Sequence, residues 1–184
     1  MKAYRLFPHD PKAGPDEPGH PLYVPRRLQA AGRYDNNRLY AALYLATSRS
    51  GAVAEALGNH AVWRDDLFDS PTTGLRRHIA TVEFDDDGVI DVDDARFLLD
   101  RGLRPTDVVG RSRARTRSLA ADLFADGHRG IRFWSYYRSE WTNVVLFLPP
   151  VTAADVTVVE VEPMTLDLPC VQAASEMLCR VIQR

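Results

Sequence analysis

The sequence predicts an α+β fold: one domain, residues 1–184, with a mixed β-sheet core and flanking helices. A chain of 184 residues suits one domain that buries about 70% of the surface of its unfolded chain. Strand-like and helix-like segments are mixed without the regular rhythm of a doubly wound parallel sheet. Hydrophobic residues make up 45% and charged residues 26%, which is ordinary for a globular protein.

Strands are expected where apolar and β-branched residues form short runs. The first is residues 3–7, and the proline- and glycine-rich stretch 8–21 after it favours an extended loop. The apolar run 38–46, with two tyrosines, suits a buried strand. The remaining β-rich runs, in chain order, are residues 76–84, 89–94, 130–137, 142–148 and 155–162.

Helices are expected in the segments that carry capping residues. Segment 47–59 has Ser48 or Ser50 as its N-cap and Gly58 just past its C-terminus. Three further helices are bounded by a glycine or by a first-turn proline: 93–102 with Gly102, 115–127 with Gly127, and 169–183 from Pro169.

Charge and cysteine content restrict the function classes. The formal net charge of −2 argues against a strongly basic nucleic-acid-binding protein. Cys170 and Cys179, placed on one predicted helix, face opposite sides of it, so free thiols and a reducing compartment are expected. The N-terminus has no apolar signal-peptide core and no run reaches the length of a membrane span. We therefore expect a cytoplasmic protein that binds neither nucleic acid directly nor membranes. The sequence leaves its oligomeric state open, a homodimer included.

An acidic stretch, "EFDDDGVIDVDD" (83–94), partly matches a calcium-binding loop. The template positions fall on Glu83, Asp85, Asp87, Gly88 and Asp94. The motif prefers Asp at its first position and Glu at its last, and it needs a helix where this chain predicts a strand. The favoured interpretation is an acidic hairpin turn that joins two strands, with Asp93 or Asp94 capping the next helix.

Other ligand-binding patterns are weak. Arg111, Arg113, Arg115 and Arg117 would line one side of an extended chain, as in a phosphate-binding edge, but a solvated basic loop that opens a helix is favoured. The five histidines show no metal-ligand spacing, so no metal is expected. The sequence also has no glycine-rich phosphate loop.

Three polar residues, Arg33, Tyr44 and Glu55, are each eleven positions apart in "GRYDNNRLYAALYLATSRSGAVAEALG". Glu55 falls outside the apolar stripe of its helix, so its pattern predicts an exposed side chain. Tyr44 in an apolar strand is typical of a core residue with a bonded hydroxyl, and Arg33 of a surface turn. Periodicity alone therefore does not predict a site.

This run resembles the RES domain family, named for a shared arginine, glutamate and serine. The stretch "TRSLAADLFADGHRGIRFWSYYRSEWTNVVLF" is similar to the C-terminal signature of the family, so the resemblance spans residues 4–147, and the strand and helix in 155–184 are assigned to the same domain. It implies the fold of diphtheria-toxin-type ADP-ribosyltransferases. It also implies a bacterial toxin that degrades NAD⁺ by hydrolysis or by phosphorolysis, with inorganic phosphate as co-substrate in the second case. The implied partner is an antitoxin with an Xre-type helix-turn-helix domain, part of which occupies the cleft of the toxin.

The resemblance implies catalytic roles for Arg33, Tyr44, Glu55 and Ser135, and NAD⁺ binding by Arg5, Arg33 and Tyr44. Glu55 would stabilise the oxocarbenium-like ribose, and Ser135 would orient Glu55 or a ribose hydroxyl. Arg5 and Arg33 suit the diphosphate, and Tyr44 offers a ring face to nicotinamide or ribose. The chain departs from the family at Trp134, where proline often precedes the serine.

Two alternatives stay open at the level of sequence. A protein ADP-ribosyltransferase would use the same residues, because the acceptor is set by what reaches the far face of the ribose. A non-catalytic module would bind a nucleotide or a partner without turnover.

Overall fold

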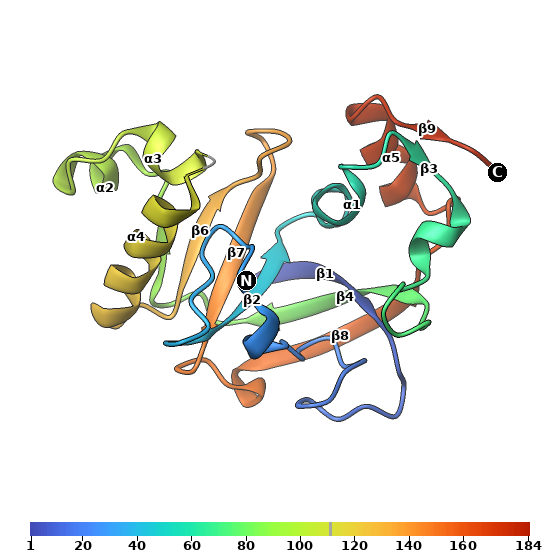
Figure 1. Ribbon diagram of the computed structural model, residues 1–184, viewed down its shortest axis with the longest axis horizontal. Coiled ribbons are helices and arrows are strands. Elements are labelled where there is room, and N and C mark those ends of the chain that lie inside the picture. Colours follow the sequence, from blue (N-terminus) through green and yellow to red (C-terminus); the bar gives the residue numbers. More distant parts are fainter. Residues whose placement is uncertain (111) are drawn as a thin grey trace.

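The computed structural model describes residues 1–110 and 112–184. Within them, seven strands form one mixed sheet in the order β5-β6-β7-β2-β1-β4-β8 (Figure 1). Neighbouring strands are antiparallel except β5 and β6, which are parallel. The strands are β1 (Lys2–Pro8), β2 (Ala41–Ala46), β4 (Arg77–Phe84), β5 (Val89–Asp91), β6 (Gly130–Trp134), β7 (Thr142–Leu148) and β8 (Val156–Pro163). The predicted α+β class is confirmed.

The sheet is divided between β1 and β2. These strands share a single register pair, Tyr4 with Ala46, whereas β1 and β4 pair along their whole length. Leu43 and Leu146 from one half of the sheet and Val82 from the other belong to the same buried cluster. The two halves therefore pack against each other, and the opening between β1 and β2 leaves room for a site.

Helices cover the outer faces of the two halves (Figure 1). Side chains of β2 and β7 alternate between the inner cluster and a second cluster, which also contains Leu119 and Leu123 of α4 together with Phe147. At the other end, α1 and α5 pack together, with Val53 and Val171 buried in one cluster. The helices are α1 (Arg49–Leu57), α2 (Ala95–Asp100), α3 (Pro105–Val109), α4 (Arg113–Ala125) and α5 (Pro169–Met177).

The predicted caps are largely confirmed. The Ser48 side chain accepts the Gly51 N–H at 3.0 Å and begins α1. Gly102 and Gly127, which follow α2 and α4, have φ values of 62° and 88°, a region that glycine adopts without steric cost. No helix in the described part of the chain has the length and apolarity needed to cross a membrane.

The end of the last helix was predicted wrongly. The helix ends at Met177 instead of residue 183, because Cys179 takes a left-handed conformation with φ of 52°. The following strand β9 (Val181–Ile182) then pairs in parallel with β3 (Val62–Trp63). Both cysteines are free, as predicted, but Cys179 lies beyond the helix that the prediction assigned to both.

The acidic stretch is not a hairpin, which corrects the favoured interpretation. Its two strands, β4 and β5, lie in different halves of the sheet, and β5 pairs with β6 instead. The Asp94 side chain accepts the Phe97 N–H at 2.9 Å and caps α2, so this part of the prediction is confirmed. A strand leads into the turn where a calcium motif needs a helix, and the described residues contain no cluster of three potential metal ligands.

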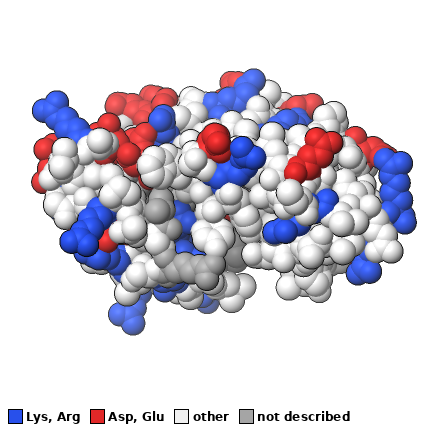
Figure 2. Space-filling model, turned by 90° about the horizontal axis from the view of Figure 1, so that it is seen from above, with Lys and Arg blue, Asp and Glu red and all other residues white. Residues whose placement is uncertain are grey.

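Acidic and basic side chains are interspersed on the face of the molecule that Figure 2 shows. Ion pairs at the surface include Arg76 with Asp65 and Arg101 with Asp126. The near balance of 23 basic and 25 acidic residues in the sequence thus extends to the local surface.

Candidate functional site

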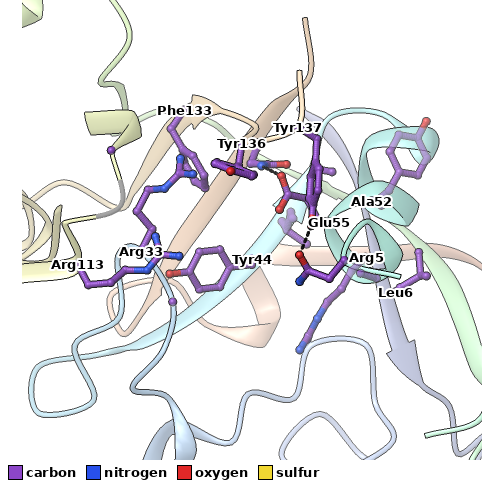
Figure 3. A pocket seen from close by; sticks show the side chains of 18 residues that line it. Arg5, Leu6, Arg33, Tyr44, Ala52, Glu55, Arg113, Phe133, Tyr136 and Tyr137 are labelled. Atoms are coloured by element: carbon purple, nitrogen blue, oxygen red, sulfur yellow. Dashed lines mark hydrogen bonds between the residues drawn. The ribbon is translucent and has the colours of Figure 1, made fainter. Parts of the chain in front are cut away.

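A cleft of about 640 Å³ lies where β1 and β2 diverge (Figure 3). Its walls come from β1, β2, α1, β6, β7, the loops before β2 and after β6, and the start of α4. Four of the sequence-predicted site residues line it, namely Arg5, Arg33, Tyr44 and Glu55. Ser135 lies behind them and contacts Glu55. The structure thus brings all five together.

Glu55 is held by two buried donors on the same oxygen. Ser135 Oγ donates to Oε1 at 2.6 Å, and Asn143 Nδ2 donates to Oε1 at 2.7 Å. Glu55 itself is exposed, whereas Ser135 and Asn143 are 7% and 5% exposed. No hydrogen bond from the described residues engages Oε2. The carboxylate is therefore fixed in orientation with one oxygen available to a ligand.

The sequence of α1 explains why the cleft is open around Glu55. Ala52 and Ala56 also line the cleft, and their small side chains leave space beside the carboxylate. Val53 and Leu57, on the other side of the helix, are fully buried and anchor it. Glu55 is thus an exposed helix residue, as its pattern predicts, on a helix whose position is fixed by packing.

Arg33 is nine-tenths buried but carries no ion pair among the described residues. Its Nη1 donates to the carbonyl of Trp134 at 3.1 Å, and its guanidinium lies 5.2 Å from the centre of the Phe133 ring. The prediction of a surface turn residue from pattern alone was wrong. A buried guanidinium that forms no ion pair with the described carboxylates is an arrangement suited to an anionic ligand.

Tyr44 stabilises the turn that contains Arg33 through hydrogen bonds. Its hydroxyl donates to Asp35 Oδ1 at 3.0 Å and accepts the Tyr34 N–H at 2.9 Å, while Asp35 Oδ2 accepts the Gly32 N–H at 2.6 Å. A Cβ at Gly32 would lie 2.4 Å from Asp35 Oδ1, so only glycine fits there. Burial and the Asp35 carboxylate raise the pKa of the Tyr44 hydroxyl, which stays neutral. Its ring still lines the cleft.

Arg5 lies on the opposite side of Tyr44 from Arg33 (Figure 3). Its Nη1 donates to the carbonyls of Pro21 and Tyr23, and thereby holds the proline-rich loop against β1. Burial lowers the pKa of the Arg5 guanidinium to about 10, so it remains charged at neutral pH.

Several residues of the cleft had no role in the sequence-based prediction. Asn143 is a buried polar residue directly before the apolar run 144–148 of β7, and this contrast is a signal that could have identified it. Tyr137 donates through its hydroxyl to Asn59 at 3.0 Å, and its N–H donates to Ser135 Oγ at 3.1 Å. Tyr136 also lines the cleft but shows no distinguishing sequence pattern.

Arg113, Arg115 and Arg117 of the arginine-rich stretch lie in the first two turns of α4, so their side chains point in different directions. Arg113 lines the cleft, Arg115 pairs with Asp107 at 2.7 Å, and Arg117 donates to the carbonyls of Ala30 and Gly32. The predicted loop is therefore corrected for Arg113, which is helical, whereas Arg115 and Arg117 lie in the helix predicted over 115–127. Arg111 lies outside the described residues.

Asp93 interacts electrostatically with Arg33, and the pKa of its carboxyl is shifted. Burial, helped by the Asp91 carboxylate, raises its pKa from 3.8 to about 7, against the opposing effects of a Trp134 backbone hydrogen bond, Arg33 and Arg132. The folded state therefore retains a proton that the unfolded state releases, and stability falls as the pH rises from about 4 to above 7.

We expect Asp93→Asn, which cannot ionise, to stabilise the protein at pH 8 and to change its stability little at pH 4. Urea unfolding of both proteins at several pH values measures the difference. A difference that stayed constant from pH 4 to pH 8 would contradict the assignment.

Comparison with known proteins finds a match to one family model and a likeness in fold to a solved structure. The family model described as "RES domain" matches residues 2–167. No curated protein gives a significant match. A chain in the crystal structure of the M. tuberculosis MbcT–MbcA toxin–antitoxin complex superposes with a TM-score of 0.62 at 15% identity, covering 97% of this chain and 88% of that chain. At this identity the likeness shows a shared fold.

Proposed function

The chain belongs to the RES domain family, and from this premise we propose that it cleaves the bond between nicotinamide and ribose in NAD⁺, as the toxin of a toxin–antitoxin pair. The observation that carries the proposal is the Glu55 carboxylate, held through one oxygen by Ser135 and Asn143 in a cleft also lined by arginines. The MbcT–MbcA complex, whose chain shares the fold, is described as a toxin–antitoxin complex.

The geometry suits a dissociative glycosyl transfer. As the C–N bond breaks, its electron pair leaves with nicotinamide, which departs neutral and needs no proton. The ribose develops positive charge, which the fixed Glu55 carboxylate stabilises, and Oε2 is available to a ribose hydroxyl. Water, which releases one proton to solvent, or an anionic oxygen of inorganic phosphate then forms the new bond to the ribose carbon. Because little proton transfer is needed at the leaving group, positioning and electrostatics supply most of the rate.

The proposed partner is an antitoxin with an Xre-type helix-turn-helix domain. Part of such a protein would occupy the cleft and exclude NAD⁺. The cleft suits this role because it opens on the surface and includes the exposed residues Glu55 and Tyr136. Inhibition of NAD⁺ consumption by the antitoxin, relieved by its removal, is the expected behaviour.

The experiment that tests the function is incubation of the purified protein with NAD⁺, with and without inorganic phosphate, followed by ³¹P NMR. We expect nicotinamide release with either ADP-ribose, which indicates hydrolysis, or a phosphorylated ADP-ribose, which indicates phosphorolysis. Transfer of label from NAD⁺ to an added protein would instead support the ADP-ribosyltransferase alternative. Intact NAD⁺ in both buffers, with protein shown to be folded and free of any antitoxin, would contradict the proposal.

A further inference from the structure

Among the residues that the structure describes, three arginines and one glutamate are the charged residues that line the cleft. The arginines differ in their partners. Arg5 has one nitrogen committed to two backbone carbonyls of the proline-rich loop. Arg33 is held in place by a carbonyl and an aromatic ring. Arg113 is exposed and has no ion pair within the described residues. The cleft therefore has an excess of positive charge on its own walls.

Arg33 and Arg113 lie on the same side of Tyr44, and Glu55 lies on the other (Figure 3). The two guanidinium groups come from separate elements, the loop before β2 and the first residue of α4. Hydrogen bonds connect these two elements. The Thr116 hydroxyl donates to the Arg33 carbonyl, and Arg117 donates to the Gly32 carbonyl. The α4 helix is 13 residues long and its N-cap residue, Ser112, makes no side-chain cap bond, so its positive end adds to the potential there.

We propose that Arg33 and Arg113 together bind the diphosphate of the dinucleotide; this rests on the proposed function, in which NAD⁺ is the substrate. A diphosphate carries one negative charge on each phosphate, and two guanidinium forks match its oxygens. Arg33 provides a rigid contact because it is buried and anchored. Arg113 provides an adaptable one because it is exposed.

The assignment differs from the sequence-based expectation, in which Arg5 and Arg33 hold the diphosphate. Arg5 instead acts as a structural residue that keeps the proline-rich loop against β1. With the diphosphate at Arg33 and Arg113, the attached ribose extends past the Tyr44 ring towards Glu55. This order places the reacting carbon beside the fixed carboxylate.

Arg115 provides a matched control for Arg113. It lies two residues further along the same helix, carries the same charge, and pairs with Asp107 at 2.7 Å away from the cleft lining. Arg113→Gln and Arg115→Gln thus remove the same charge from the same helix, and only the first removes it from the cleft.

The experiment is isothermal titration of the full chain with ADP-ribose, a ligand that has the diphosphate but no bond to cleave. We expect Arg113→Gln to weaken binding about tenfold, the effect of one charge-assisted hydrogen bond at a solvated site. Arg115→Gln should stay within about twofold of the parent, as expected for an exposed charge. Added salt should weaken ADP-ribose binding more in the parent than in Arg113→Gln. With NAD⁺, Arg113→Gln should raise KM and leave kcat nearly unchanged.

Equal affinity of the parent and Arg113→Gln for ADP-ribose would overturn the proposal. An equal loss in both variants would also overturn it, because the effect would then come from general surface charge. The proposal would also be overturned if the parent protein did not bind ADP-ribose. Thermal melting confirms that each variant is folded. Since binding needs no turnover, a positive titration with no NAD⁺ cleavage would remove the proposed activity and keep the diphosphate subsite.

Discussion

Replacing Glu55 by Gln is expected to lower the rate of NAD⁺ cleavage by about a thousandfold, the upper range for loss of one preorganised electrostatic group. The amide has the shape of the carboxylate and its oxygen still accepts hydrogen bonds from Ser135 and Asn143. What it lacks is the negative charge that stabilises the oxocarbenium-like ribose. The initial rate of nicotinamide release, measured at saturating NAD⁺, reports the change in kcat.

Glu176→Gln is the matched control, because Glu176 is an exposed helix residue on α5 that does not line the cleft. We expect it to keep the parental rate. Both variants should retain the parental stability within about 0.5 kcal/mol, as is usual for exposed positions. Parental turnover by Glu55→Gln would remove Glu55 from the mechanism, and equal losses in both variants would point to a nonspecific effect.

The largest expected loss of stability follows truncation of Phe147. This side chain is fully buried on β7, between the sheet and α4, with its ring centre 4.3 Å from that of Tyr40 and 5.7 Å from that of Phe124. Phe147→Ala removes these ring contacts and leaves a cavity that a strand in mid-sheet cannot close. We expect the free energy of unfolding to fall by about 3–5 kcal/mol, and the melting temperature by about 10 °C.

Urea unfolding measures this change, with an unaltered m-value expected if the unfolded state is unaffected. Leu99→Ala is the control, because Leu99 is 80% exposed on α2 and its truncation should change stability by less than about 0.5 kcal/mol. A loss below about 1 kcal/mol in Phe147→Ala would show that the packing around α4 is looser than the structure indicates.

The elements that the sequence predicted correctly are those whose signals are local. The Ser48 cap, the glycines after α2 and α4 and the apolar runs of β2 and β7 act within a few residues of the chain. The errors concern pairing between distant segments. The stretch 169–183 is helical by composition, but residues 181–182 pair with β3. Val181 pairs with Val62, which lies 119 residues earlier in the chain. Likewise β5 pairs with β6 and not with its neighbour in sequence, β4.

The functional site shows the same contrast between local signals and contacts between distant segments. The even spacing of Arg33, Tyr44 and Glu55, together with the resemblance of the surrounding run to a family, is contained in the sequence by itself. The sequence could not show that Asn143 reaches Glu55, a contact across 88 residues that exists because β7 lies beside β2 with Asn143 opposite Ala46. Nor could it show that Arg113, and not Arg115, faces the cleft. Hydrogen-bond partners of this kind depend on strand register and helix rotation, and both are fixed only when the buried clusters pack.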